Sequence, residues 1–80
     1  MDFGFAIKAL KEGKRVHRAG WNGKGMWLVL INPGNAMHTS QAGGFDMQPC
    51  IGMKTATNVM QPGWLASQPD MLAEDWSVVE

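Results

Sequence analysis

An uninterrupted apolar run at residues 26–31 constrains the fold of this chain more than any other feature. As a strand, the run places Met26, Leu28 and Leu30 on one face and Trp27, Val29 and Ile31 on the other. A strand with one solvated face alternates apolar and polar residues, so this strand is expected to be covered on both sides. A helix can supply one cover. In a chain of 80 residues, the second cover points to another subunit.

A turn signal precedes this run. The dipeptide Asn22-Gly23 is typical of a two-residue type I′ turn, because Asn and Gly tolerate the positive φ that both positions require. The sequence therefore predicts a β-hairpin whose first strand is residues 14–18 and whose second strand is the apolar run.

The remaining elements are predicted from periodicity and breakers. Asp2 can cap a helix at residues 3–12, whose apolar positions recur at helical spacing and which Gly13 ends. Further strands are expected at residues 49–54, 56–61 and 75–79, with a single helical turn at 67–71 that has Pro69 near its start. Residues 32–48 are rich in Gly, Asn, Ser and Thr and predict a long irregular loop. The sum is an α+β fold in one domain spanning residues 1–80, with an N-terminal helix packed on an antiparallel sheet of about five strands.

Composition narrows the range of partners. Seven basic and seven acidic residues cancel, so the chain has no net field to hold DNA or RNA. A charged fraction of 18% is low and is expected if much of the surface meets another subunit. Cys50 stands alone, which excludes a disulfide framework and favours a buried thiol. No apolar run is long enough for a signal peptide or a membrane span, so we expect a cytoplasmic protein without a membrane partner.

Catalytic signals are weak. His17 and His38 stand at no recognisable metal or triad spacing, and residues 20–25 lack the pattern of a phosphate-binding Walker A loop. Asp70, Glu74 and Asp75 can be imagined as an acid and base pair, although capping and solvation explain them more simply. We expect no cofactor, no metal and no enzymatic activity.

Two tryptophans are accompanied by polar groups. Trp21 is near Arg18, Asn22 and Lys24, and Trp64 is followed by Ser67 and Asp70. An indole face can stack on a nucleobase, an interaction of about 1–3 kcal/mol, while Arg18 and Lys24 can neutralise a pyrophosphate. The residues leave two outcomes open, a nucleotide pocket around Trp21 or packing of Trp21 against a neighbouring subunit.

Four blocks of sequence carry a family resemblance: residues 3–14, the turn and strand at 18–28, residues 53–56, and the segment 64–76. These blocks resemble the phage Thoeris anti-defence proteins of the second type, which are small sponges that sequester immune signalling nucleotides. The resemblance runs from end to end except for residues 32–48.

The resemblance implies a helix on a twisted antiparallel sheet, assembled as a homotetramer with ligand pockets between subunits. It implies binding, without cleavage, of cyclised ADP-ribose signals such as glyco-cyclic ADP-ribose, in the cytoplasm of the infected bacterial host. Some relatives also hold the cyclic oligonucleotides of CBASS at a separate site.

Position by position, the resemblance places the stacking tryptophan at Trp21 and the ligand-reading residues at Asn58 and Asp70. The leading hypothesis is therefore a non-enzymatic nucleotide sponge. Its alternatives are a hydrolase of the same signals, with Asp70 or Asp75 as base together with His17 or His38, and a purely structural assembly protein.

Overall fold

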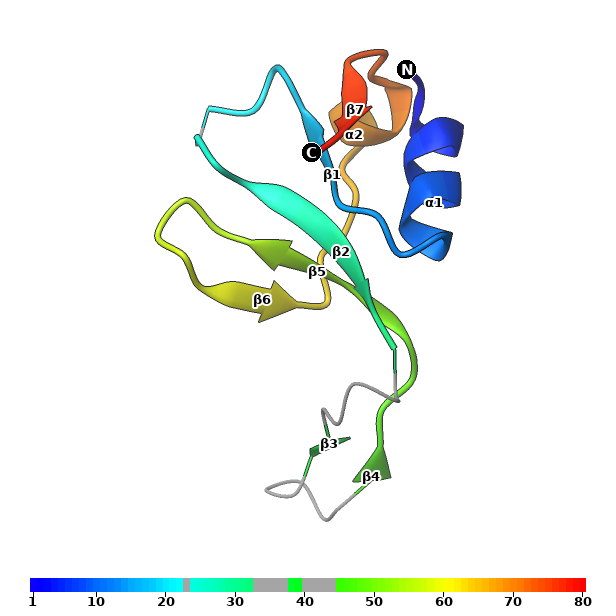
Figure 1. Cartoon of the computed structure of the whole chain (residues 1–80), viewed down its shortest axis with the longest axis vertical. Helices are drawn as coiled ribbons and strands as arrows, with labels where there is room; N and C mark the ends of the chain where they lie inside the picture. Colours follow the sequence, from blue (N-terminus) through cyan, green and yellow to red (C-terminus); the bar gives the residue numbers. More distant parts are fainter. Residues whose placement is uncertain (23, 33–37, 40–44) are drawn as a thin grey trace.

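A computed structural model describes residues 1–22, 24–32, 38–39 and 45–80. The elements along the chain are α1 (Phe3–Lys11), β1 (Val16–Arg18), β2 (Trp27–Ile31), β3 (His38–Thr39), β4 (Phe45–Asp46), β5 (Cys50–Lys54), β6 (Met60–Pro62), α2 (Gln68–Leu72) and β7 (Trp76–Val78). Figure 1 shows α1 beside β1, β7 and α2, with β3 and β4 extending from the far end of β2 and β5. Among these residues, no helix has the length and apolar character needed to cross a membrane.

Helix α1 forms as the sequence predicts. Asp2 is its N-cap and accepts a hydrogen bond from Phe5 N at 2.9 Å. Lys8 and Lys11 lie in the last turn, where positive charge suits the carbonyl end of the helix. Gly13 follows with a φ of 85°, a conformation that glycine adopts without strain.

The sheet has five strands in the order β6-β5-β2-β1-β7, and all its pairs are antiparallel. Strand β2 is central and pairs with β5 along its whole length, from Trp27 opposite Lys54 to Ile31 opposite Cys50. Its pairing with β1 is short, with Val16 opposite Leu28. The predicted α+β class, the N-terminal helix and the five-strand sheet are confirmed.

The core lies between α1 and one face of the sheet. It consists of buried apolar side chains from α1, β1, β2 and β7, namely Ala6, Ala9, Leu10, Val16, Leu28 and Trp76. Helix α2 is held on the same face, because Asp70 contacts Arg18 of β1 and Trp76 of β7. The expectation that a helix covers one face of β2 is confirmed.

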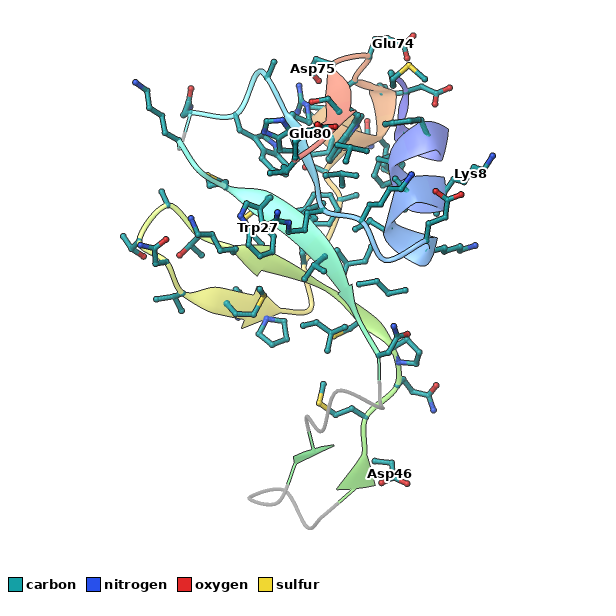
Figure 2. The ribbon with its side chains drawn as sticks, in the orientation of Figure 1. Lys8, Trp27, Asp46, Glu74, Asp75 and Glu80 are labelled. Atoms are coloured by element: carbon teal, nitrogen blue, oxygen red, sulfur yellow. The ribbon has the colours of Figure 1, made fainter. Side chains whose placement is uncertain are left out.

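The second sheet face consists of Trp27, Val29 and Ile31 with their cross-strand partners Cys50, Gly52, Lys54, Met60 and Pro62. A Cβ on Gly52 would lie 2.6 Å from Ile31 Cδ1 and 2.8 Å from Met60 Sδ, so the glycine makes room for both side chains. The Arg15 guanidinium lies 5.0 Å from the centroid of the Trp27 ring, which Figure 2 labels on β2. Ile31 is buried by these contacts, whereas Trp27 and Val29 stay half-buried and Met60 is exposed.

The predicted hairpin is confirmed, since β1 and β2 are adjacent antiparallel strands, but its connection is not the predicted two-residue turn at Asn22-Gly23. Strand β1 ends at Arg18 and β2 begins at Trp27, so the connection spans residues 19–26, of which Gly23 lies outside the described residues. The physical reason is tertiary. The β1–β2 register contains only Val16 opposite Leu28, whereas Arg18 pairs with Trp76 of β7 and the Gly20 amide donates to Asp75 Oδ2 at 2.7 Å, so this segment is held at β7 rather than paired with β2.

The predicted strand at 56–61 is also corrected, since β6 begins only at Met60. Thr55 N donates to Val59 O at 2.8 Å, and Asn58 N donates to Thr55 O at 3.0 Å, so these residues form the turn between β5 and β6. Asn58 has a φ of 64°, a conformation in which asparagine is common. Pro62 is tolerated in β6 because this strand lies at the edge of the sheet.

Smaller boundary corrections concern four elements. Strand β1 begins at Val16 rather than at 14, β5 at Cys50 rather than at 49, and β7 is Trp76–Val78. The single helical turn predicted at 67–71 is the short helix α2, with Ser67 as N-cap. The long loop predicted at 32–48 lies largely outside the described residues, and its described part contains the antiparallel pair β3–β4.

Candidate functional site

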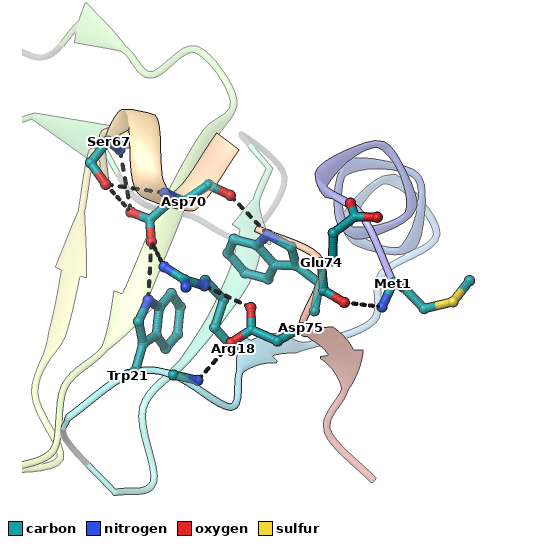
Figure 3. Close-up of polar contacts among 9 residues, drawn as sticks. Met1, Arg18, Trp21, Ser67, Asp70, Glu74 and Asp75 are labelled. Atoms are coloured by element: carbon teal, nitrogen blue, oxygen red, sulfur yellow. Dashed lines mark hydrogen bonds and ion pairs between the residues drawn. The ribbon is translucent and has the colours of Figure 1, made fainter. Parts of the chain in front are cut away.

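The centre of the candidate site is the carboxylate of Asp70, a buried residue. Its Oδ1 accepts hydrogen bonds from Arg18 Nη1 at 2.8 Å and from Trp21 Nε1 at 3.2 Å. Its Oδ2 accepts from Ser67 Oγ at 2.9 Å and from Ser67 N at 3.2 Å. Figure 3 shows these contacts converging from β1, the 19–26 connection and the start of α2. The structure therefore brings together four of the predicted site residues.

Local sequence explains how Asp70 is held. Ser67 and Asp70 form a capping box in which Asp70 N donates to Ser67 Oγ at 3.3 Å while the Asp70 carboxylate accepts from Ser67 N. A helix as short as α2 is not stable alone, so its position depends on tertiary anchors. One anchor is Trp76 Nε1, which donates to Asp70 O at 3.0 Å.

Arg18 binds a second carboxylate. Its Nε donates to Asp75 Oδ1 at 2.9 Å, while its Nη1 remains on Asp70. We call Arg18, Asp70 and Asp75 the ion cluster. It places one cation between two carboxylates, with the side chains of Arg18 and Asp70 17% and 13% exposed. Phosphate binding by Arg18, as the sequence predicts, would have to compete with both carboxylates.

The ionisation of the cluster follows from its contacts. Burial is the largest single influence on the Asp70 pKa and raises it, but the hydrogen bonds from Arg18, Trp21 and Ser67 together outweigh it, so the pKa is lowered. The Arg18 hydrogen bond is the main cause of the lowered pKa of Asp75. In turn, Asp75 and then Asp70 raise the pKa of Arg18. All three groups are therefore charged at neutral pH.

Three tryptophans pack edge to face beside the ion cluster. The ring centroid of Trp21 lies 5.4 Å from that of Trp76 and 6.4 Å from that of Trp64, and the Trp64 and Trp76 centroids are 6.3 Å apart. Trp76 is 1% exposed and belongs to the core, while Trp21 and Trp64 are half-buried. The Trp21 ring is thus oriented by two aromatic contacts and one hydrogen bond.

The other predicted residues lie on nearby connections. Asn22 and Lys24 are exposed in the 19–26 connection, and Asn58 is exposed in the 55–59 turn. Because Trp27 pairs with Lys54, both segments leave the same end of the sheet. Lys54 Nζ also donates to Gly25 O at 2.8 Å, which ties β5 to the 19–26 connection. Asn58 is not among the donors to Asp70, and its turn conformation is explained without a ligand.

Sequence reasoning missed the principal role of Asp75. The predictions treated Asp75 as a solvated carboxylate or a candidate base, whereas the structure pairs it with Arg18, which lies 57 residues earlier in the chain. No local motif encodes a contact at that separation. Only the small residue at Gly20 hints at it, because a Cβ there would lie 2.9 Å from Asp75 Oδ2.

The fold and the site define a small α+β domain in which a partly buried ion cluster lies against three packed tryptophans. The chain belongs to the Thoeris anti-defense 2-like family, whose domain model matches residues 1–79. It is 42% identical over 86 residues to Thoeris anti-defense 2 of Bacillus phage SP01, an alignment that covers 99% of this chain and 94% of that protein. This membership supports a role in phage anti-defence.

Proposed function

We propose that this chain is a nucleotide sponge, which binds cyclised ADP-ribose signals of the Thoeris defence system and sequesters them without cleavage. It acts in the cytoplasm of the infected bacterial host, and glyco-cyclic ADP-ribose is its expected ligand. The observation that carries the proposal is Trp21, a half-buried indole held by Asp70 beside Trp64, in a chain of the Thoeris anti-defense 2-like family.

The orientation of Trp21 favours stacking. A side chain that is already fixed loses little rotamer freedom when a ligand binds, so more of the stacking energy contributes to affinity. Stacking of one base on an indole supplies about 1–3 kcal/mol. Nanomolar affinity, which a sponge needs in order to compete with an effector, corresponds to about 12 kcal/mol. The remaining walls of the pocket must therefore come from other residues, and Asn22, Lys24 and Asn58 are the proposed polar contributors.

A second copy of the chain is the proposed source of the missing wall, in a homotetramer. The second sheet face presents half-buried Trp27 and Val29 and exposed Met60, while both helices pack on the opposite face. Burial of such apolar surface against a second copy stabilises both chains. The chain has no net charge, so identical copies meet without net repulsion.

The ionisation of Asp70 supports binding rather than hydrolysis. A general base works best with a pKa near the operating pH and needs a free oxygen within reach of the proton that it removes. Both oxygens of Asp70 already accept hydrogen bonds, and the Asp70 pKa is lowered. Such a carboxylate is a weak base, whereas it is well suited to hold neighbouring side chains in place.

The deciding experiment mixes the purified protein with glyco-cyclic ADP-ribose, removes free ligand, and denatures the complex by heat. Mass spectrometry of the released small molecules then identifies what was held. Release of the intact signal is the expected result, and release of a linear hydrolysed product would show an enzyme. If neither this signal nor cyclic ADP-ribose nor a cyclic oligonucleotide is retained, the chain is a structural assembly protein and the proposal is wrong.

A further inference from the structure

We propose that Asp75 is a positioning residue for Trp21, because it holds both the Arg18 side chain and the backbone that precedes Trp21. The proposed consequence for ligand affinity rests on the nucleotide-binding function above. The consequence for the orientation of the indole does not, since it concerns the protein without ligand.

The Trp21 indole and the Arg18 guanidinium share one acceptor. Asp70 Oδ1 accepts from both Arg18 Nη1 and Trp21 Nε1, so the guanidinium and the indole meet at one oxygen. Ser67 binds the other carboxylate oxygen, so Arg18 is the charged group that holds the oxygen shared with Trp21. The opposite side of the guanidinium is bound by Asp75 Oδ1 through Arg18 Nε. Asp75 therefore determines the position of the cation that fixes the acceptor of the Trp21 indole.

Asp75 also holds the backbone of the connection. Asp75 Oδ2 accepts from Gly20 N at 2.7 Å, and Gly20 immediately precedes Trp21. Trp21 N itself donates to Arg18 O at 3.3 Å, which closes a turn over residues 18–21. The two oxygens of Asp75 thus hold Trp21 in two ways. Oδ1 binds the Arg18 side chain, and Oδ2 binds the main chain at Gly20.

The Asp75 carboxylate can be neutralised without leaving a buried charge unpaired. Its side chain is 32% exposed, and Arg18 keeps Asp70 as its partner when Asp75 is replaced. The backbone of Asp75 has its own contact, since Ala19 N donates to Asp75 O at 3.3 Å. In Asp75→Asn this backbone bond and the Asp70–Arg18 ion pair remain, and we expect the domain to fold.

The test uses the indole N–H signals of the full chain in ¹H–¹⁵N correlation spectra. The four tryptophans give one signal each, and Trp21→Phe assigns that of Trp21. In Asp75→Asn, the Trp21 signal is expected to shift or broaden while the Trp27 signal stays in place. Glu74→Gln is the matched control, because it removes the same charge from an exposed neighbouring side chain. An unchanged Trp21 signal in Asp75→Asn would overturn the proposal.

Affinity is the second readout. Calorimetry with glyco-cyclic ADP-ribose should show about a five- to tenfold weaker Kd in Asp75→Asn, because a mobile indole must be ordered on binding. A shifted indole signal with an unchanged Kd would overturn the link between positioning and affinity. If the wild-type chain binds no such nucleotide, the proposed function fails while the indole signal still decides the positioning role.

Gly20→Ala supplies an independent variant that keeps every charge. Its Cβ would lie 2.9 Å from Asp75 Oδ2 and 3.3 Å from Arg18 Nη2, so it displaces the same carboxylate by contact. The same change in the Trp21 signal is expected. If Asp75→Asn does not fold, Gly20→Ala decides alone, and an unaltered Trp21 signal in this variant contradicts the proposal.

Discussion

The indole nitrogen of Trp21 lies 3.2 Å from Oδ1 of Asp70, although 49 residues separate the two in the chain. This hydrogen bond joins the residue proposed to stack on a nucleotide to the most buried carboxylate of the described chain. The bond makes the orientation of the Trp21 indole depend on the ionisation of Asp70 and on the packing of α2.

Replacement of Asp70 by alanine should destabilise the fold by about 2–4 kcal/mol, because Arg18 loses one of its two partners and α2 loses its capping box. Urea denaturation followed by tryptophan fluorescence measures the change. Asp46→Ala, at an exposed position of β4, is the control and should alter stability by less than about 0.5 kcal/mol. Equal stabilities of the two variants would show that the ion cluster contributes little.

Stability should fall with acidification. The pKa values of Asp70 and Asp75 are lowered in the folded chain, so in acid the unfolded chain binds more protons. The contribution of the two carboxylates is fully present above their unfolded pKa of about 4, and it is lost as the pH falls through their lower folded values. Unfolding free energies measured from pH 6 to pH 2 should show this decline. Asp75→Asn should have a shallower profile, and an equally steep one would exclude Asp75 as a contributor.

Trp21→Ala should abolish most of the affinity for glyco-cyclic ADP-ribose while the chain keeps its oligomeric state. The expected loss from the stack is about 1–3 kcal/mol, or roughly 5- to 150-fold in Kd. Trp21→Phe keeps an aromatic face but loses the hydrogen bond to Asp70, so its affinity should lie between that of the wild-type chain and that of Trp21→Ala. Calorimetry measures Kd, and light scattering measures the oligomer. Normal affinity in Trp21→Ala would refute the assignment of this residue as the stacking surface.

Val29→Lys should break the proposed homotetramer, because it places a charge at the middle of the second sheet face. Size-exclusion chromatography with light scattering should report a tetramer for the wild-type chain and a smaller species for the variant. Gln68→Lys, which adds the same side chain at an exposed position of α2, is the control. A wild-type monomer, or a Val29→Lys tetramer, would leave the second sheet face without a role in assembly.

Gly52→Ala should destabilise the sheet by about 1–3 kcal/mol, because its Cβ would overlap with Ile31 and Met60. Gly4→Ala offers the contrasting substitution. Its Cβ would lie 3.5 Å from Asp2 Oδ1, an ordinary contact, and alanine favours the helix by up to about 1 kcal/mol. Thermal unfolding measures both effects. Gly52→Ala should lower the Tm, and Gly4→Ala should raise or preserve it. The opposite order would contradict the described packing of the second sheet face.

Much of the fold was predictable because its signals are local. The helix at Phe3–Lys11 has its cap at Asp2, its apolar stripe and its terminating glycine within a dozen residues of sequence. The apolar run at 26–31 likewise predicts a strand covered on both faces, and the helix-covered face is present in the structure. The Asn22-Gly23 signal predicted the hairpin of β1 and β2 but not the length of its connection, because a dipeptide shows which turn is tolerated and not where each strand ends.

The sequence by itself determined the fold class and the association of Trp21 and Trp64 with polar residues. Tertiary structure decided what those polar residues do. Arg18 meets Asp70 across 52 residues and Asp75 across 57, and such partners are chosen by how α2 and β7 pack on β1. The sequence does not distinguish an arginine that is free to bind a phosphate from one that is paired with two carboxylates, because the difference depends on distances and burial in the folded chain.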